Sequence, residues 1–229
     1  MMHSAHGDTV SRHDLPWRGA AQSGAQLPSA VAGKAEGGHR AAEEVRQRVG
    51  IGEVAASATP VVLQAVLGSC VAVCLYDPAL KIGGMNHILV PSSRAGRDCA
   101  ARCGVQAMEL LINAMMHLGA DRRRFVAKAF GGANVLPNFT PPTVGELNAG
   151  FVRRFLATEK IPLLAERMGG NSAVQLRFDT ASSKATVRAV SGAILPAIVR
   201  EEDRYFHAGL CERFHVEEPI VFERPGRKG

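Results

Sequence analysis

The chain has 229 residues, a formal net charge of +6 and a composition that is 46% hydrophobic and 5% aromatic, which is typical of one globular domain with a tail. The positive charge favours acidic partners, but aromatic residues are few and no nucleic-acid-binding motif is present, so we expect no nucleic-acid partner. The chain has neither a run of 18 apolar residues nor an apolar signal core, so we predict a cytoplasmic protein without membrane insertion.

Residues 1–49 differ in composition from the rest of the chain. They are rich in Gly, Ala, Ser and His, and their apolar residues show no period. This pattern predicts a disordered N-terminal extension. We expect order to begin near Ile51 and residues 50–229 to form a single domain.

A β-hairpin is predicted between residues 71 and 90. Residues 71–76 and 82–90 are apolar runs rich in β-branched side chains, and Asp77 and Pro78 between them are typical of a type I turn. A strand over residues 61–63 leads into this hairpin. If residues 77–80 close it without a bulge, the predicted pairs are Tyr76 with Lys81, Cys74 with Gly83, Ala72 with Met85, and Cys70 with His87.

This register makes the thiol of Cys70 and the imidazole of His87 neighbours. Directly opposed Cβ atoms lie about 4.5 to 5.5 Å apart, close enough for an imidazole to take the proton of a thiol. Gly68 and Ser69 mark a bend before Cys70, where backbone N–H groups can stabilise an oxyanion. A cysteine in an apolar strand is more often a buried hydrophobic residue. Two features favour a nucleophile, namely the bend at Gly68 and Ser69 and the pair Gly83 and Gly84, which indicates a bulge or a close backbone approach.

Two amphipathic helices are predicted in the middle of the chain. The first runs from Asp98 to about Leu118, and its methionines lie at helical spacing, which predicts that they belong to the core. The second begins after Thr143, which forms a capping-box pattern with Glu146. Its expected apolar face consists of Leu147, Phe151 and Phe155.

Strand patterns dominate the remaining segments. The predicted elements are a strand over residues 126–130, a hairpin of 174–178 with 185–190, a charged surface helix over 200–210 and a strand over 220–222. The first of these strands ends in Gly131 and Gly132, which we interpret as a tight turn at the rim of the cleft. Because strands outnumber helices and the hairpins are local, we predict an α+β fold, a layered sandwich of mostly antiparallel sheets with flanking helices.

Several motifs around the predicted hairpin point to one protein family. They are Gly68-Ser69-Cys70 within residues 67–78, Gly84-Met85-Asn86-His87, and Val90-Pro91, with further similarity at residues 128–133 and 169–171. Together these motifs resemble the chemoreceptor glutamine deamidases, the CheD family of bacterial chemotaxis. The resemblance covers roughly residues 50 to 192.

The resemblance implies roles for particular residues. It implies that Cys70 is the nucleophile and His87 its base, in a sandwich whose site resembles those of deamidating bacterial toxins. The family commonly has a catalytic Thr shortly before the Cys, where this chain has Gln64 and Ala65. The amide of Gln64 can accept a hydrogen bond from an imidazole N–H, so Gln64 is our candidate for orienting His87.

The implied function is that of a protein-glutamine deamidase (protein-glutamine glutaminase). It would convert specific glutamines of methyl-accepting chemoreceptors to glutamate through a Cys-His thioester mechanism, without a cofactor or a metal. The implied partners are the cytoplasmic helical region of the receptors and a phosphatase of the CheC type.

Three alternative functions stay open on the sequence. The main one is a chemotaxis adaptor that binds receptors or a CheC-type phosphatase and has little or no catalysis. A methyl-ester hydrolase would use the same acyl-enzyme on the same receptors. A cysteine protease would need an extended cleft that the sequence does not indicate.

Overall fold

The computed structural model describes residues 44–90, 97–135, 142–190, 192–207 and 219–224, which lie in one unit of the chain, residues 42–229. Its elements in chain order are β1 (Arg46–Arg48), β2 (Val54–Ser57), β3 (Val62–Leu67), β4 (Val71–Asp77), β5 (Ile82–Ile88), α1 (Arg97–His117), the 3-10 helix η2 (Arg122–Arg124), β6 (Val126–Gly131), α2 (Val144–Thr158), β7 (Leu163–Met168), β8 (Val174–Asp179), β9 (Ala185–Ala189), the 3-10 helix η3 (Gly192–Ile194), α3 (Leu195–His207) and β10 (Ile220–Phe222). Among the helices of these ranges, none combines the length and the apolar character needed to cross a bilayer.

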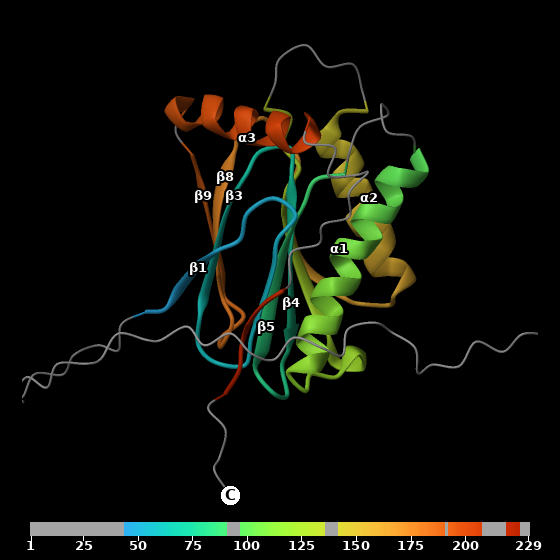
Figure 1. Ribbon diagram of the computed structural model, residues 1–229, viewed down its shortest axis with the longest axis vertical. Coiled ribbons are helices and arrows are strands. Elements are labelled where there is room, and N and C mark those ends of the chain that lie inside the picture. The colour runs from blue at the N-terminus through green and yellow to red at the C-terminus, as the bar shows by residue number, and fades with distance from the viewer. Residues whose placement is uncertain (1–43, 91–96, 136–141, 191, 208–218, 225–229) are drawn as a thin grey trace, which may run out of the picture. The chain divides into compact units, whose positions relative to one another are not determined.

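The described strands form two sheets. The smaller sheet has the order β1-β3-β8-β9, and the larger has the order β10-β2-β5-β4-β6-β7. Most neighbours are antiparallel, while β1 with β3, β10 with β2 and β6 with β7 are parallel. Helices α1 and α2 cover one face of the larger sheet, the smaller sheet covers the other, and α3 lies across one end (Figure 1). The predicted α+β sandwich of mostly antiparallel sheets is confirmed.

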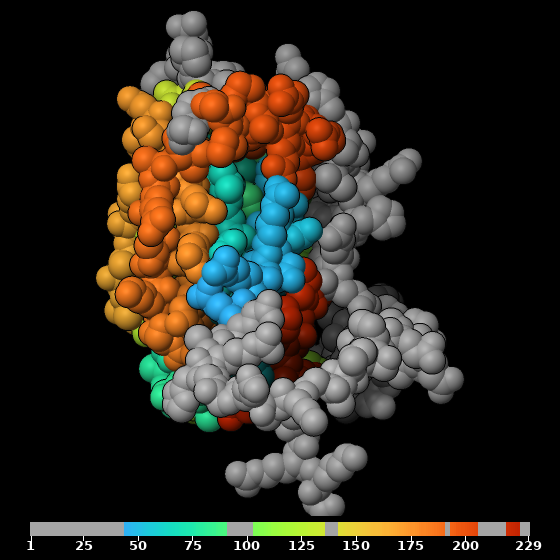
Figure 2. Space-filling view, turned by 90° about the vertical axis from the view of Figure 1, so that its left-hand side faces the viewer, coloured from blue at the N-terminus to red at the C-terminus, as the bar shows by residue number. Residues whose placement is uncertain are grey.

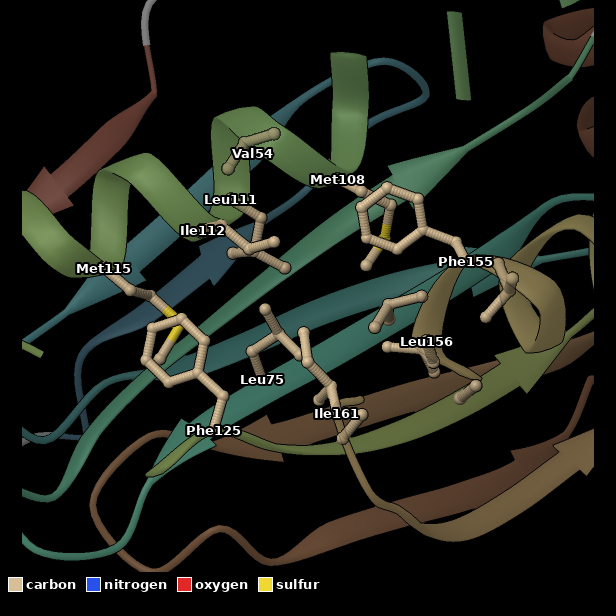
Figure 3. Packing of buried hydrophobic residues seen from close by; sticks show 14 of the residues in the cluster. Val54, Leu75, Met108, Leu111, Ile112, Met115, Phe125, Phe155, Leu156 and Ile161 are labelled. Carbon is tan, nitrogen blue, oxygen red and sulfur yellow. The ribbon is translucent and has the colours of Figure 1, made fainter. Parts of the chain in front are cut away.

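The core between the larger sheet and the helices is built from α1, α2 and the side chains of β2, β4, β5 and β6 that face them (Figure 3). Met108 and Met115 of α1 are fully buried there, which confirms the prediction for these two methionines, while Met116 is 45% exposed. The capping box of Thr143 with Glu146 is also confirmed. The predicted face of α2 is partly wrong, because Leu147 is 37% exposed. The buried side chains of α2 are instead Asn148, Ala149, Val152, Phe155 and Leu156.

A second core lies between the two sheets, and it contains the side chains that matter for the site. Successive residues of a strand point to opposite faces, so Cys70, Ala72 and Cys74 face the smaller sheet while their neighbours face the helices. On the facing strand β3, the alternate residues Leu63, Ala65 and Leu67 are buried in the same core.

Three strands were not predicted. They are β1, β2 and β7, and β1 lies within the predicted N-terminal extension. Ordered structure therefore begins before Ile51, where we expected it, because residues 46–48 pair in parallel with residues 62–64 of β3. A short strand held by such a non-local pair has no hydrophobic period of its own to reveal it. The extension's residues 1–43 lie outside the described residues.

The hairpin of β4 and β5 forms with a register different from the predicted one. His87 lies opposite Ala72, Met85 opposite Cys74, and Ile82 opposite Asp77. The predicted opposition of Cys70 and His87 is therefore wrong by two residues. The turn consists of residues 78–81, with Lys81 in the left-handed region at φ 53°, while the Asp77 carboxylate accepts hydrogen bonds from the N–H groups of residues 79 and 80. A shift of two residues keeps every side chain on its predicted face.

Candidate active site

The side chains of Cys70 and His87 occupy the same face of the larger sheet, between the two sheets. Both are buried, with exposed fractions of 1% and 3%. Because Ala72 lies opposite His87 and Cys70 lies two residues before Ala72, the two residues are diagonal neighbours across the hairpin. Diagonal neighbours are about 7–8 Å apart at the backbone, within reach of long side chains. The two side chains therefore share one face of the sheet, without a hydrogen bond between them in the described residues.

The two ring nitrogens of His87 have different surroundings. Nδ1 lies 3.1 Å from the main-chain oxygen of Val49, which can only accept, so Nδ1 carries the proton. Nε2 is buried and has no hydrogen-bond partner among the described residues. Burial lowers the pKa of His87 to about 4. At neutral pH the ring is therefore neutral, with a free lone pair on Nε2, as a general base requires.

Contrary to our prediction, the side chain of Gln64 is not placed to orient His87. Gln64 lies on β3 between Leu63 and Ala65, which point into the inter-sheet core, so its side chain points to the other face of the smaller sheet. The main chain of Gln64 contributes instead, since its carbonyl oxygen accepts a hydrogen bond of 2.8 Å from the N–H of Val49. Gln64 thus supports the residue that orients His87.

The thiol of Cys70 contacts a carboxylate that the sequence analysis did not select. Cys70 Sγ donates to Oε1 of Glu202 over 3.3 Å, and Glu202 is a buried residue of α3. The pKa of Cys70 is raised well above its ordinary value, chiefly by burial and next by the charge of Glu202. In this arrangement the thiol is therefore protonated at neutral pH, and the thiol, unlike the thiolate, is a poor nucleophile.

The backbone at the bend before β4 also points at Glu202. The N–H groups of Ser69 and Cys70 donate to its Oε1 over 2.9 and 3.4 Å, and the hydroxyl of Ser69 donates to Oε2 over 2.7 Å. The two N–H donors converge on one carboxylate oxygen, Oε1, in a buried place. An arrangement of this kind can stabilise the oxyanion of a tetrahedral intermediate, and its donors come from Ser69 and Cys70, not from Gly68.

Gly131 and Gly132 lie against the bend that precedes β4. The N–H of Gly132 donates to the carbonyl oxygen of Cys70 over 2.7 Å, so this N–H is not available to a substrate. Gly131 has φ 105°, and a Cβ there would lie 2.2 Å from the same carbonyl oxygen. Glycine is required by this close approach and this backbone angle. Both glycines therefore shape the bend at Cys70, and the N–H of Gly132 is not an oxyanion donor in this structure.

Asn148 of α2 connects the segments that carry the nucleophile and the base. Its side-chain amide donates to the carbonyl oxygen of Ser69 over 2.9 Å, and its Oδ1 accepts from the N–H of Val90 over 2.7 Å. Asn148 is fully buried, so both bonds are protected from water. Val90 follows β5, and Asn148 thereby fixes the distance between the two halves of the site.

The sequence analysis missed Val49, Asn148 and Glu202. Val49 lies in the predicted extension, and its contribution is a main-chain atom that no sequence pattern reveals. The other two had a signal, namely a polar residue on the apolar stripe of an amphipathic helix. Asn148 precedes the buried Val152 at helical spacing, and Glu202 follows the buried Ile198 in the same way.

The described residues contain no group of three or more His, Cys, Asp or Glu side chains that is placed to hold a metal ion.

Comparisons with known proteins add an independent result. A family model described as CheD chemotactic sensory transduction matches residues 89–189. The probable chemoreceptor glutamine deamidase CheD of Stenotrophomonas maltophilia (strain K279a) is 58% identical over 108 residues, which are 47% of this chain and 54% of that protein. The corresponding protein CheD 1 of Ruegeria sp. (strain TM1040) is 48% identical over 125 residues, or 55% of this chain and 66% of that one.

The extent of these matches bears on what they support. The chain spans about half the length of the first of these relatives. The family model includes Gly131, Gly132 and Asn148 and begins just after His87. Among solved structures, the Bacillus licheniformis hypothetical protein YfiH has a TM-score of 0.34 and 17% identity, over 50% of this chain and 49% of its own. That similarity is too low to indicate a fold or a function.

Proposed function

Since the chain belongs to the CheD family of chemotactic sensory transduction, we propose that it is a deamidase that converts glutamine side chains of chemoreceptors to glutamate. The observation that carries the proposal is the common placement of Cys70, His87 and the two N–H donors of Ser69 and Cys70 at one end of the inter-sheet core. The names of the curated relatives support the same reaction.

In the first step of the proposed mechanism, Nε2 of His87 takes the proton of Cys70. The thiolate attacks the side-chain carbonyl carbon of the receptor glutamine, and a C–S bond forms while the carbonyl oxygen becomes an oxyanion. The N–H groups of Ser69 and Cys70 donate to that oxyanion. The fixed tautomer of His87 supports this step, because its protonated Nδ1 is held by Val49 and leaves Nε2 free to accept.

In the second step, the imidazolium of His87 returns the proton to the leaving nitrogen. The C–N bond breaks, ammonia departs, and a glutamyl thioester on Cys70 remains. Water, activated by the neutral His87, then attacks the thioester and releases glutamate and the free thiol. Removal of one donor from an oxyanion site of this kind typically costs a factor of about 10² to 10³ in kcat.

The substrate is proposed to be a glutamine on the helical cytoplasmic region of a methyl-accepting receptor. Each conversion adds one negative charge to that helix. The net charge of +6 favours an acidic partner surface of this kind. The run Arg122 to Arg124 is a weak candidate for the contact, because all three guanidinium groups are already paired with carboxylates of the same chain.

The second candidate function is an adaptor that binds receptors or a CheC-type phosphatase without catalysis. The observation in its favour is the protonated, buried thiol of Cys70, held against the carboxylate of Glu202. The two candidates differ in a single measurable respect, since only the enzyme changes the mass of a receptor.

Mass spectrometry of a receptor cytoplasmic fragment after incubation with the protein tests the proposal. Each deamidation adds about 1 Da to the peptide that contains the glutamine. We expect conversion with the wild type and with Cys74→Ala, and none with Cys70→Ala. Cys74 is a matched control because it is equally buried, at 1% exposure, in the same core. Binding of the fragment by the wild type without any mass change would replace the enzyme by the adaptor.

A further inference from the structure

Helix α3 places an acidic side chain inside the candidate active site. Glu202 is only 4% exposed, although acidic residues are seldom buried without partners. Among the described residues, its hydrogen bonds all come from two residues, Ser69 and Cys70. The carboxylate therefore occupies the oxyanion donors and the thiol at the same time.

The chemistry of this contact matches the product of the proposed reaction. Deamidation leaves a glutamate side chain whose carboxylate has just departed from the Cys sulfur and from the oxyanion donors. Glu202 is such a side chain, it is carried by a helix, and its Oε1 lies 3.3 Å from Cys70 Sγ and 2.9 Å from the N–H of Ser69. A glutamine amide would fit the same donors, because its oxygen can accept from Ser69 N–H and its NH₂ can donate to Ser69 Oγ.

The fit extends to the backbone beneath the helix. A Cβ at Gly68 would lie 2.9 Å from Oε1 of Glu202 and 3.0 Å from the side chain of Ile198. Glycine at this position lets a helix approach closely enough for its glutamate to reach the thiol. Any receptor helix that presents a glutamine to Cys70 needs the same space, so α3 and the substrate cannot be bound together.

The attachments of α3 are modest compared with those of the two main cores. Ile198 belongs to a small apolar cluster with three other buried residues, Ala133, Val135 and Ala173, and Leu195 packs against it. The only other apolar contact of α3 with a core cluster of the described residues is that of the partly buried Tyr205 with the inter-sheet core. At the surface, Glu201 forms an ion pair of 2.8 Å with Arg48, and both partners are substantially exposed. Figure 2 shows α3 in orange-red beside the blue segment that carries Arg48. An element with few buried apolar contacts opens locally at a small fraction of the global unfolding free energy.

From these contacts we propose that α3 is an internal product mimic: Glu202 occupies the place of the glutamate side chain of a modified receptor helix, and α3 must leave before a substrate glutamine reaches Cys70. This inference rests on the proposed deamidase function and adds to it the mode of substrate binding and its regulation. The substrate is a glutamine on a helix, and that helix competes with α3 for the same donors.

Alkylation of Cys70 by iodoacetamide tests the closed arrangement without any assumption about the substrate. We compare the wild type, Glu202→Ala and a control variant of α3 at one pH, with folding checked by circular dichroism. The matched control is Arg204→Ala, which truncates an exposed side chain two residues from Glu202 on the same helix. We expect Glu202→Ala to alkylate about tenfold faster or more, as loss of the bonds that close the site increases the open fraction. The control should alkylate at the wild-type rate.

Kinetics on a receptor fragment test the product mimic itself. Competition by α3 predicts that Glu202→Ala lowers KM severalfold and leaves kcat nearly unchanged. A fall in kcat would overturn the proposal, because it would make Glu202 a catalytic group. Ile198→Ser, which weakens the packing of α3 and leaves Glu202 intact, should reproduce the faster alkylation.

The two proposals fail in different ways. If alkylation of Cys70 is as slow in Glu202→Ala and Ile198→Ser as in the wild type, α3 does not close the site and the further inference is wrong, whatever the deamidase activity. If alkylation accelerates but no variant deamidates any receptor fragment, the proposed function is overturned, and with it the identity of Glu202 as a product mimic.

Discussion

The main-chain oxygen of Val49 accepts the hydrogen bond of His87 Nδ1 over a distance of 3.1 Å, and this contact decides which nitrogen of His87 can act as a base. The main chain of His87 is held by the segment that contains Val49, since the N–H of Gly52 donates to the carbonyl oxygen of His87 over 2.8 Å. The orientation of the candidate base therefore comes from backbone atoms of residues 49–52. A backbone acceptor does this without help from the side chain at position 64.

Our first prediction is that Gln64→Ala keeps receptor glutamine turnover within about twofold of the wild type. The side chain of Gln64 lies on the outer face of β3, and its carbonyl oxygen, which accepts from Val49 N–H, is present in any residue. Steady-state kinetics and a urea unfolding curve measure the two effects separately. A fall in turnover of tenfold or more at unchanged stability would restore the side chain of Gln64 as the orienting group.

The second prediction concerns the pH dependence of stability. Burial lowers the pKa of His87 from 6.5 to about 4, so between these values the unfolded chain binds a proton that the folded chain does not. The stability from this group is complete above pH 6.5 and is lost as the pH falls through 4. Between pH 7 and pH 4.5 we expect a loss of about 2 kcal/mol from His87.

Urea unfolding at the two pH values measures that loss, with His87→Gln as the reference for the groups that titrate elsewhere. The wild type should lose more free energy of unfolding than His87→Gln over the same interval. An equal loss in both proteins would mean that His87 is accessible to solvent in the folded chain.

A third prediction separates the position of the nucleophile from general stability. Asn148→Ala removes two buried hydrogen bonds, one to Ser69 and one to Val90, and Asn86→Ala removes three from the side of β5 that faces the helices. Each variant should lose about 2–4 kcal/mol of stability, because buried backbone groups are left unpaired. We expect kcat to fall strongly only in Asn148→Ala. Similar kcat values for the two variants would assign Asn148 a structural role alone.

The fourth prediction follows from the geometry of Glu202. In Glu202→Gln the introduced amide meets the same donors and the same thiol, so Cys70 should deamidate it within the chain and restore the acid. Mass spectrometry of the peptide that contains position 202 should show a gain of about 1 Da with time. The combined variant with Cys70→Ala should keep the amide. An amide that persists while the same preparation deamidates a receptor fragment would contradict the product mimic.

Some features of this protein were determined by local sequence alone. The capping box of Thr143 fixed the start of α2, and the alternation of residues 174–178 fixed the buried face of β8, because both depend on neighbours within a few residues. The same period of two put Cys70 and His87 on one face of the sheet, even though the turn was assigned one residue too early, which shifts the pairing register by two residues. Local patterns therefore identified the candidate nucleophile and base.

Other features depended on contacts between distant segments, which only the tertiary structure decided. Val49, Asn148 and Glu202 come from β1's end, α2 and α3, and each acts on the site through a single hydrogen-bonding group. A run of side chains indicates a helix or a strand, because many residues share its period. A single polar group does not indicate which distant group it will contact. The site's base orientation, its oxyanion donors and its closure by Glu202 arise where these segments meet, since a hydrogen bond is defined by distance and angle in the folded chain.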